Sequence, residues 1–207
     1  MHYLVTCATG FIGRRLVRKL LERRGAIVYF LVREESLAKV DELLAWWGVD
    51  RSRAISITGN LTQPGLGLSD ADRQRLTGQV RHLFHLAAVY DLAADEVSQQ
   101  VANVEGTKRV VELANALGAQ CFHHMSSIVA AGLFEGIFRE DMFEEAENLE
   151  HPYFRTKHDA ERIVRDTCRV PWRIYRPGIV VGDSHTGEID KIDGPYYFFK
   201  PIQKLRR

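Results

Sequence analysis

Cysteine is scarce in this chain, and its spacing excludes two common uses of the residue. Only three cysteines, at positions 7, 121 and 168, occur in 207 residues. They are too few for a disulfide framework and do not have the spacing of metal ligands, so we expect reduced thiols and a cytoplasmic protein. The adjacent His123 and His124 would point to opposite faces of a strand. The sequence therefore predicts no metal site.

Long apolar runs, linkers and a strong net charge are missing as well. The longest apolar stretches are far shorter than a membrane span, and nothing is typical of a signal peptide. The formal net charge is only +1, which provides no field to attract nucleic acid or a membrane surface. No Pro/Gly/Ser-rich linker or repeat divides the chain. With 45% hydrophobic and 27% charged residues, the composition indicates one domain with a sizeable core.

The chain does contain strand-like and helix-like segments in alternation. Strands are expected at residues 3–6, 26–32, 54–57, 80–88, 121–126 and 172–175, and helices around 16–21 and over 36–47, 95–117 and 153–166. This order is the βαβ signature. Because such crossovers are right-handed, we predict the α/β class and a Rossmann-type, doubly wound parallel sheet with helices on both faces.

A glycine motif lies at the first predicted strand-to-helix turn, with Gly10 and Gly13 three residues apart. Unpaired N–H groups and the positive end of the helix dipole favour a pyrophosphate there. Gly10 lets the backbone approach the phosphates, and Gly13 lets helix and strand pack closely. The motif predicts dinucleotide contacts from Thr6, Thr9, Gly10, Phe11, Ile12 and Gly13.

Cys7 stands where this motif usually has its first glycine. A side chain at this position can strain the tight turn or crowd the cofactor, so we expect a weakened dinucleotide site. A nucleophilic thiol, activated by the helix N-terminus, is the alternative interpretation.

The ends of the next strands carry further candidate cofactor contacts. Arg33 follows the second strand, where a planar cation suits the 2′-phosphate of NADP, although Glu34 and Glu35 leave a merely solvated arginine possible. Asn60, followed by Leu61, faces the adenine edge or closes a turn. Small residues after the fourth strand, Ala87 and Ala88, leave room for the cofactor. Whether Asn103 and Thr107 structure the site or only their helix stays open.

Tyr153 and Lys157 form the second informative motif. Four residues apart on a helix, they share one face. A nearby ammonium lowers the pKa of a phenol from about 10, so we predict that Lys157 tunes Tyr153 as a proton donor. Ser126 and Ser127 lie at the carboxyl end of the fifth strand, where a hydroxyl can donate to a developing oxyanion.

These motifs stand in the order and spacing of the extended short-chain dehydrogenase/reductase family, which the whole chain resembles. The resemblance implies a catalytic triad of Ser127, Tyr153 and Lys157, since Ser127 lies five residues before Gly132. It also implies that the turn after Arg176 borders the nicotinamide. The residues concerned there are Pro177, Gly178 and Ile179. Two departures from the family pattern, Cys7 and Asn60, put cofactor affinity in doubt more than the chemistry.

Three segments, over residues 85–91, 136–146 and 186–200, look like the amino-terminal reductase part of bacterial fatty acyl-CoA reductases. Those proteins use NADPH and are much longer. We therefore expect residues 1–207 to be one NADP(H)-binding domain, truncated within a longer polypeptide, in which about 183–207 begins a substrate lobe. The aromatic residues 196–199 line an acyl site or pack in a core. After Lys200 we expect no completed element.

The resemblance implies NADPH-dependent reduction of a fatty acyl thioester or its aldehyde, in a protein with a possible homo-oligomeric state. A nucleotide-sugar epimerase or dehydratase is the rival enzyme, because the same triad serves both reactions. A catalytically idle NADP-binding module is the rival outside enzymes, and Cys7 favours it.

Overall fold

The computed structural model describes residues 1–88, 95–189 and 194–205. They form two compact units, Met1–Arg176 and Pro177–Arg207, which are described separately. Parts of the motifs discussed above, at Val89, Tyr90 and Asp91 and over 190–193, lie outside the described residues, as do Arg206 and Arg207.

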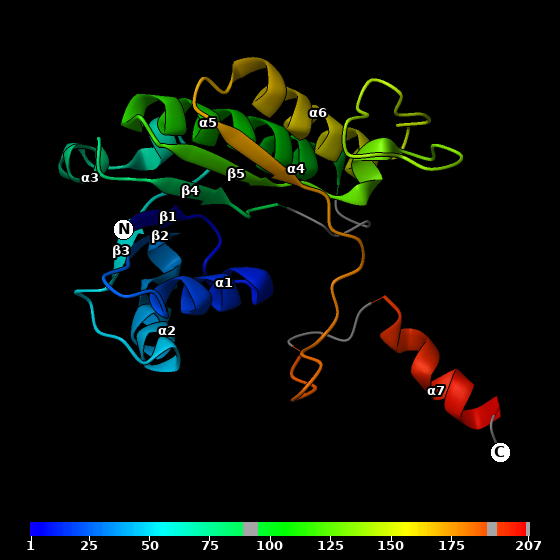
Figure 1. Ribbon diagram of the computed structural model, residues 1–207, viewed down its shortest axis with the longest axis horizontal. Coiled ribbons are helices and arrows are strands. Elements are labelled where there is room, and N and C mark those ends of the chain that lie inside the picture. The colour runs from blue at the N-terminus through cyan, green and yellow to red at the C-terminus, as the bar shows by residue number, and fades with distance from the viewer. Residues whose placement is uncertain (89–94, 190–193, 206–207) are drawn as a thin grey trace. The chain divides into compact units, whose positions relative to one another are not determined.

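A six-stranded parallel sheet forms the centre of the first unit, in the order β3-β2-β1-β4-β5-β6 (Figure 1). Its strands are β1 (His2–Val5), β2 (Ile27–Val32), β3 (Ala54–Thr58), β4 (His82–His85), β5 (Cys121–Met125) and β6 (Trp172–Tyr175). The order reverses direction between β1 and β4, which is the topological switch point of a doubly wound sheet. The predicted Rossmann-type fold is confirmed.

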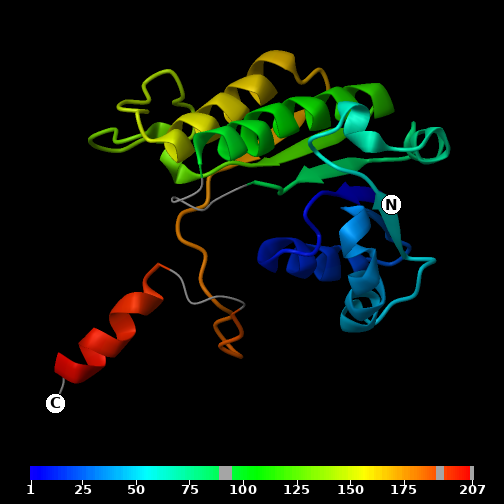
Figure 2. The same cartoon turned by 180° about the vertical axis from the view of Figure 1, so that it is seen from behind.

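Helices cover both faces of the sheet, as Figures 1 and 2 show from opposite sides. On one face, α1 (Phe11–Leu21) and α2 (Val40–Trp47) bury Val17, Leu44 and Trp47 against β1 and β2. On the other face, the sheet packs against α3 (Asp70–Leu76), α5 (Gly106–Leu117) and α6 (Pro152–Thr167). The strand β2 is apolar along its whole length because both of its faces are covered, whereas β4 and β5 also carry histidines.

Several local predictions need correction. The helix expected over 36–47 is a 3-10 helix, η1 (Glu34–Lys39), followed by α2, whose N-cap is Lys39. The run 95–117 is helical throughout, but a wider π segment, η3 (Gln100–Glu105), separates α4 (Glu96–Gln99) from α5. Two further 3-10 helices are η2 (Pro64–Gly67) and η4 (Ile128–Ala131).

The helix α3 lies between the strands expected at 54–57 and 80–88, where no helix was expected. Ser69 caps it by accepting from the backbone N–H of Asp72 at 3.1 Å, and the Ser69 hydroxyl donates to the carboxylate of Asp72. This Ser-x-x-Asp spacing is a helix-start signal that was readable in the sequence.

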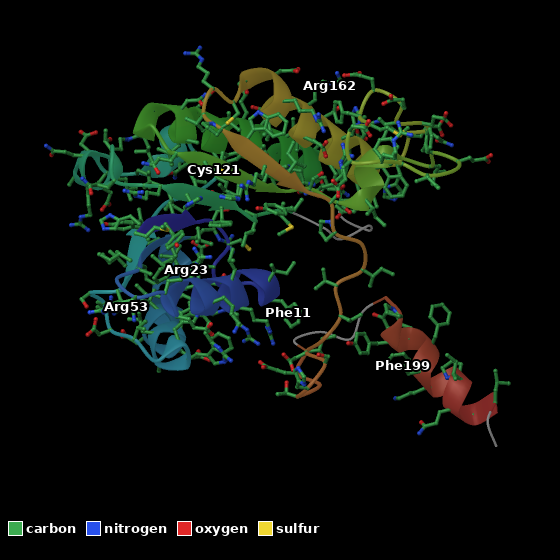
Figure 3. All side chains as sticks on the ribbon, in the orientation of Figure 1. Phe11, Arg23, Arg53, Cys121, Arg162 and Phe199 are labelled. Carbon is green, nitrogen blue, oxygen red and sulfur yellow. The ribbon has the colours of Figure 1, made fainter. Side chains whose placement is uncertain are left out.

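The second unit contains α7 (Tyr196–Leu205), so the expectation of no completed element after Lys200 is wrong. The helix continues through Pro201. Three of its aromatic side chains are more exposed than buried within this unit, namely Tyr197, Phe198 and Phe199, of which Figure 3 labels Phe199. Among the described residues, no helix is both long and apolar enough to span a membrane.

Candidate active site

The turn between β1 and α1 is built around two glycines that could not be replaced without movement. A Cβ added at Gly13 would lie 2.0 Å from the carbonyl oxygen of Cys7, and one at Gly10 would lie 3.1 Å from the Cys7 sulfur. Gly10 is the N-cap of α1 and has no side chain to cap the helix. The first-turn N–H groups of α1 are therefore available to a pyrophosphate, which fits the dinucleotide prediction.

Cys7 adopts the left-handed conformation, with φ at +56°. This backbone region favours glycine, which explains why a side chain at position 7 departs from the expected motif. Desolvation raises the pKa of the Cys7 thiol despite a hydrogen bond to the Gly10 backbone and the charge of Arg33. The conditions for a nucleophilic thiol are not met, because the thiolate is disfavoured.

Thr6 is fixed at the end of β1 by a buried histidine. Its hydroxyl oxygen accepts from the backbone N–H of Leu86 at 3.1 Å and of Ala87 at 3.3 Å. The Thr6 proton is then directed to Nδ1 of His85, 3.0 Å away. Burial, together with the charge of Lys157, lowers the pKa of His85 to about 3, so this histidine is neutral. The strand ends of β1 and β4 are thus held together.

The same histidine connects to the helices behind the sheet. His85 Nε2 lies 3.0 Å from the Thr107 hydroxyl, which donates to the backbone carbonyl of Asn103 at 2.6 Å. Asn103 donates its side-chain amide to Thr156 on α6 at 3.2 Å. Asn103 and Thr107 therefore do more than structure their own helix, since they connect the cofactor turn to the helix that carries Tyr153.

The remaining candidate cofactor residues lie at the same carboxyl edge of the parallel sheet. Arg33 follows β2, and its exposed guanidinium pairs with Glu35 at 3.1 Å. The side-chain oxygen of Asn60, Oδ1, accepts from both the backbone N–H and the hydroxyl of Thr62 at 2.9 Å. These two hydrogen bonds close a turn. Thr9 is exposed, whereas Phe11, Ile12, Leu61, Ala87 and Ala88 are half-buried. Their contacts with a dinucleotide stay predictions.

Ser127 and Tyr153 come together although 26 positions separate them in the sequence. Ser127 follows β5, and α6 starts at Pro152 behind the cap that His151 provides to Tyr153 N at 3.1 Å. The Ser127 hydroxyl, which accepts from the backbone N–H of Val129 at 3.3 Å, lies near the Tyr153 phenol. Burial raises the pKa of Tyr153, and the neighbouring Ser127 side chain opposes the rise.

The predicted tuning of Tyr153 by Lys157 needs correction in this structure. The Lys157 ammonium lies on the same face of α6, but it donates to the backbone carbonyl of Met125 at 2.8 Å. Ser127, and not Lys157, lowers the pKa of Tyr153. Burial also lowers the pKa of Lys157 itself to about 8, against the opposing charge of Glu161. The ammonium is anchored to the end of β5.

A buried ionic network beneath these residues was missed in the sequence analysis. Glu161 is fully buried and accepts from Ser126 at 2.9 Å, from Arg165 at 2.9 Å and from Arg176 Nε at 3.0 Å. Burial alone would raise the pKa of Glu161, but the hydrogen bonds from both arginines and Ser126 outweigh it and lower the pKa. Because the Ser126 hydroxyl is bonded to Glu161, Ser127 is the serine near Tyr153. The i,i+4 spacing of Glu161 and Arg165 was the one readable signal.

Pro177, Gly178 and Ile179 begin the second unit, where Ile179 is exposed. Their predicted place beside the nicotinamide stays a prediction.

A model of an NAD-binding family described as male sterility protein matches residues 5–206. The chain belongs to this family. The predictions of the extended short-chain dehydrogenase/reductase family, with its enzyme class and its nicotinamide cofactor type, are confirmed.

The chain matches a small part of each of several much longer proteins. The chain is 35% identical to a linear gramicidin synthase protein of Brevibacillus parabrevis, over 92% of this chain and 4% of that protein. It is 28% identical to "Glycine betaine reductase ATRR" of Emericella nidulans, over 92% of this chain and 16% of that one. These names do not support the acyl-CoA reductase part of the resemblance drawn above.

Solved structures agree with the fold. The terminal R domain from the myxalamid PKS-NRPS pathway has a TM-score of 0.77 at 30% identity, over 90% of this chain and 50% of that domain. UDP-glucuronic acid 4-epimerase from Bacillus cereus, in complex with NAD, has a TM-score of 0.67 at 23% identity, over 88% and 58%. The chain thus spans about half of the solved reductase domain and a small share of the curated relatives.

Proposed function

We propose that this chain is the dinucleotide-binding and catalytic part of a reductase domain that releases a carrier-bound thioester as an aldehyde, using NADPH. The observation that carries the proposal is that Ser127, after β5, and Tyr153, at the start of α6, lie near each other at the sheet edge that also holds the glycine turn. The 35% and 30% identities to a gramicidin synthase and to a terminal R domain support a thioester as substrate.

The residues of this site have complementary tasks. When bound, the dinucleotide supplies a hydride to the thioester carbonyl carbon. Ser127 and Tyr153 donate hydrogen bonds to the carbonyl oxygen as it becomes negative, and Tyr153 delivers the proton that the oxygen needs. Expulsion of the thiol then gives the aldehyde. The Lys157 ammonium, held by the Met125 carbonyl on the same face of α6 as Tyr153, would bind the cofactor ribose.

A substrate panel tests the proposal. The full-length protein is incubated with NADPH and a peptidyl or acyl thioester of N-acetylcysteamine, palmitoyl-CoA, or a UDP-sugar, and products are identified by mass spectrometry. We expect aldehyde and free thiol from the N-acetylcysteamine thioester. Conversion of the UDP-sugar alone would indicate an epimerase or dehydratase. Cofactor binding without any turnover would indicate an idle module, and either result contradicts the proposal.

Arg33 supports the choice of NADPH over NADH. Its guanidinium is 65% exposed at the end of β2 and pairs only weakly with Glu35, because both groups lie in water. We expect Arg33→Ala to weaken NADPH binding at least tenfold and to leave NADH binding within about twofold, since a 2′-phosphate contact is worth about 1.4 kcal/mol or more. Isothermal titration of both cofactors measures this.

Arg51→Ala is the matched control, because Arg51 is another exposed arginine paired with a carboxylate, Asp41. Its NADPH affinity should equal that of the wild type. An unchanged preference for NADPH in Arg33→Ala would remove Arg33 from the 2′-phosphate site.

A further inference from the structure

Three potential metal ligands meet on one face of the sheet, outside the proposed active site. They are His82 on β4 and Cys121 and His123 on β5, and one ligand atom of each lies within 4.8 Å of the others. Figure 3 labels Cys121 on β5. We propose that this His82–Cys121–His123 cluster binds a zinc ion or a similar thiophilic divalent metal.

The strand register explains why the three side chains converge. His82 and Cys121 are direct partners in the parallel pair β4–β5, so they start the two strands on the same face. His123, two residues beyond Cys121, returns to that face, while His124 points to the opposite one. His123 and His124 therefore cannot bind one metal together, but the pairing of β4 with β5 places His82 and Cys121 on the same face as His123.

The two imidazole rings turn a nitrogen atom toward each other, as two ligands of one metal would. His82 Nδ1 lies 2.9 Å from His123 Nε2. Tetrahedral zinc needs ligand atoms about 3.3–3.8 Å apart, given Zn–N of about 2.0–2.1 Å and Zn–S of about 2.3 Å. Side-chain adjustments of less than about 1 Å at each ligand satisfy this geometry. The site would have three protein ligands and a fourth position for water.

Two neighbouring aromatic residues fix the orientation of the His123 ring. Its Nδ1 lies 2.9 Å from the Tyr175 hydroxyl on β6, and its ring stacks on Phe84 with centroids 4.1 Å apart. When the metal takes Nε2, the imidazole proton moves to Nδ1 and is donated to the Tyr175 oxygen. Ligating histidines commonly donate their other nitrogen in this way.

Ligand chemistry and access also favour a thiophilic metal. Two imidazole nitrogens and one sulfur form a donor set that suits zinc, and the Cys121 thiol would release its proton on binding. His82 and Cys121 are half-buried, which leaves a path for an ion to enter.

Cobalt(II) titration of the tag-free, full-length protein at pH 7.5 tests the site. A thiolate–cobalt charge-transfer band should appear with one equivalent and disappear when zinc is added. Cys121→Ser should abolish this band, and His82→Asn and His123→Asn should weaken cobalt binding at least tenfold.

Cys168→Ser is the matched control, because Cys168 is also half-buried and free but lies outside the cluster. It should keep the band. NADPH binding by each variant shows that it is folded, and His82→Asn serves as the test if Cys121→Ser does not fold. Absence of the band from the wild type, or its loss in Cys168→Ser with retention in Cys121→Ser, overturns the proposal.

Discussion

At position 7, a single side chain sits in a conformation that favours glycine. The positive φ of Cys7, +56°, costs a non-glycine residue about 1–2 kcal/mol, and its sulfur lies against Gly10 in the turn that receives the pyrophosphate. A glycine has no such cost in the folded turn, but it adds entropy to the unfolded chain worth about 0.4–1 kcal/mol. These two effects on folding nearly cancel.

We therefore expect Cys7→Gly to leave the free energy of unfolding within about 1 kcal/mol of the wild type and to tighten NADPH binding about threefold, because the phosphates approach the backbone more closely. Chemical denaturation and fluorescence titration measure the two quantities. Cys7→Ala, which retains a Cβ, should not reproduce the gain. Equal affinity in the wild type and Cys7→Gly would mean that the turn already accommodates the thiol.

The residue scale also shows where sequence reasoning ends. The spacing of Gly10 and Gly13 was sufficient to predict the turn. At both positions an added Cβ would lie too close to atoms of Cys7, as the close packing of this motif requires. The i,i+4 spacing correctly placed Tyr153 and Lys157 on one face, but it could not tell that the ammonium would be drawn to the Met125 carbonyl. That contact depends on the packing of α6 against the end of β5, which no local pattern encodes.

At the scale of elements, α6 is joined to β5 and β6 by the buried carboxylate of Glu161. Arg165 lies on the same helix, Ser126 follows β5 and Arg176 follows β6. Removing one partner of a buried ion pair costs about 3–5 kcal/mol, because the other charges stay buried without compensation. We expect Glu161→Gln to lower the free energy of unfolding at pH 7 by about 3 kcal/mol.

The pH dependence of this loss follows from the lowered pKa of Glu161. A carboxyl with a depressed pKa in the folded state stabilises the fold above its unfolded pKa of about 4.3, and the stabilisation is lost as the pH falls through the folded value. The stabilities of Glu161→Gln and wild type should therefore differ most near neutral pH and converge only as the pH falls below the unfolded pKa and through the lower folded one. Denaturation at several pH values measures the difference.

Glu144→Gln is the control, since Glu144 pairs with Arg162 on the same helix but is 73% exposed. Its effect should be much smaller than that of Glu161→Gln, because water screens an exposed ion pair. A comparable loss in both variants would mean that burial does not set the value of the Glu161 network.

Across the whole molecule, the order of strands was predictable and the finer connections were not. Apolar runs such as Ile27–Val32 identify strands, and the handedness of βαβ crossovers leaves few ways to arrange them. The helix α3 was not predicted because it has only seven residues, most of them polar, and so gives no clear apolar periodicity. Relays such as Thr6–His85–Thr107 join residues about 80 and 22 positions apart, so only the assembled sheet brings them together.

The complete protein should depend on Tyr153 for turnover and not for cofactor binding. The Tyr153 hydroxyl meets charge that develops mainly in the transition state, so Tyr153→Phe should lower kcat for thioester reduction by about 10³-fold while the NADPH Kd changes less than about twofold. Stopped-flow NADPH oxidation and isothermal titration, both on the full-length protein, separate the two effects.

The adjacent serines supply the control for this comparison. Ser127→Ala removes the hydroxyl near Tyr153, so kcat should fall by about 10–100-fold, and the loss of the cap to Val129 N–H should lower the melting temperature only slightly. Ser126→Ala removes a bond to the buried Glu161, so it should lower the melting temperature and alter kcat much less. If Tyr153→Phe kept near-normal turnover, or if Ser126→Ala lost more turnover than Ser127→Ala, proton delivery would have to come from another group. The place of Ser127 near Tyr153 would then be structural.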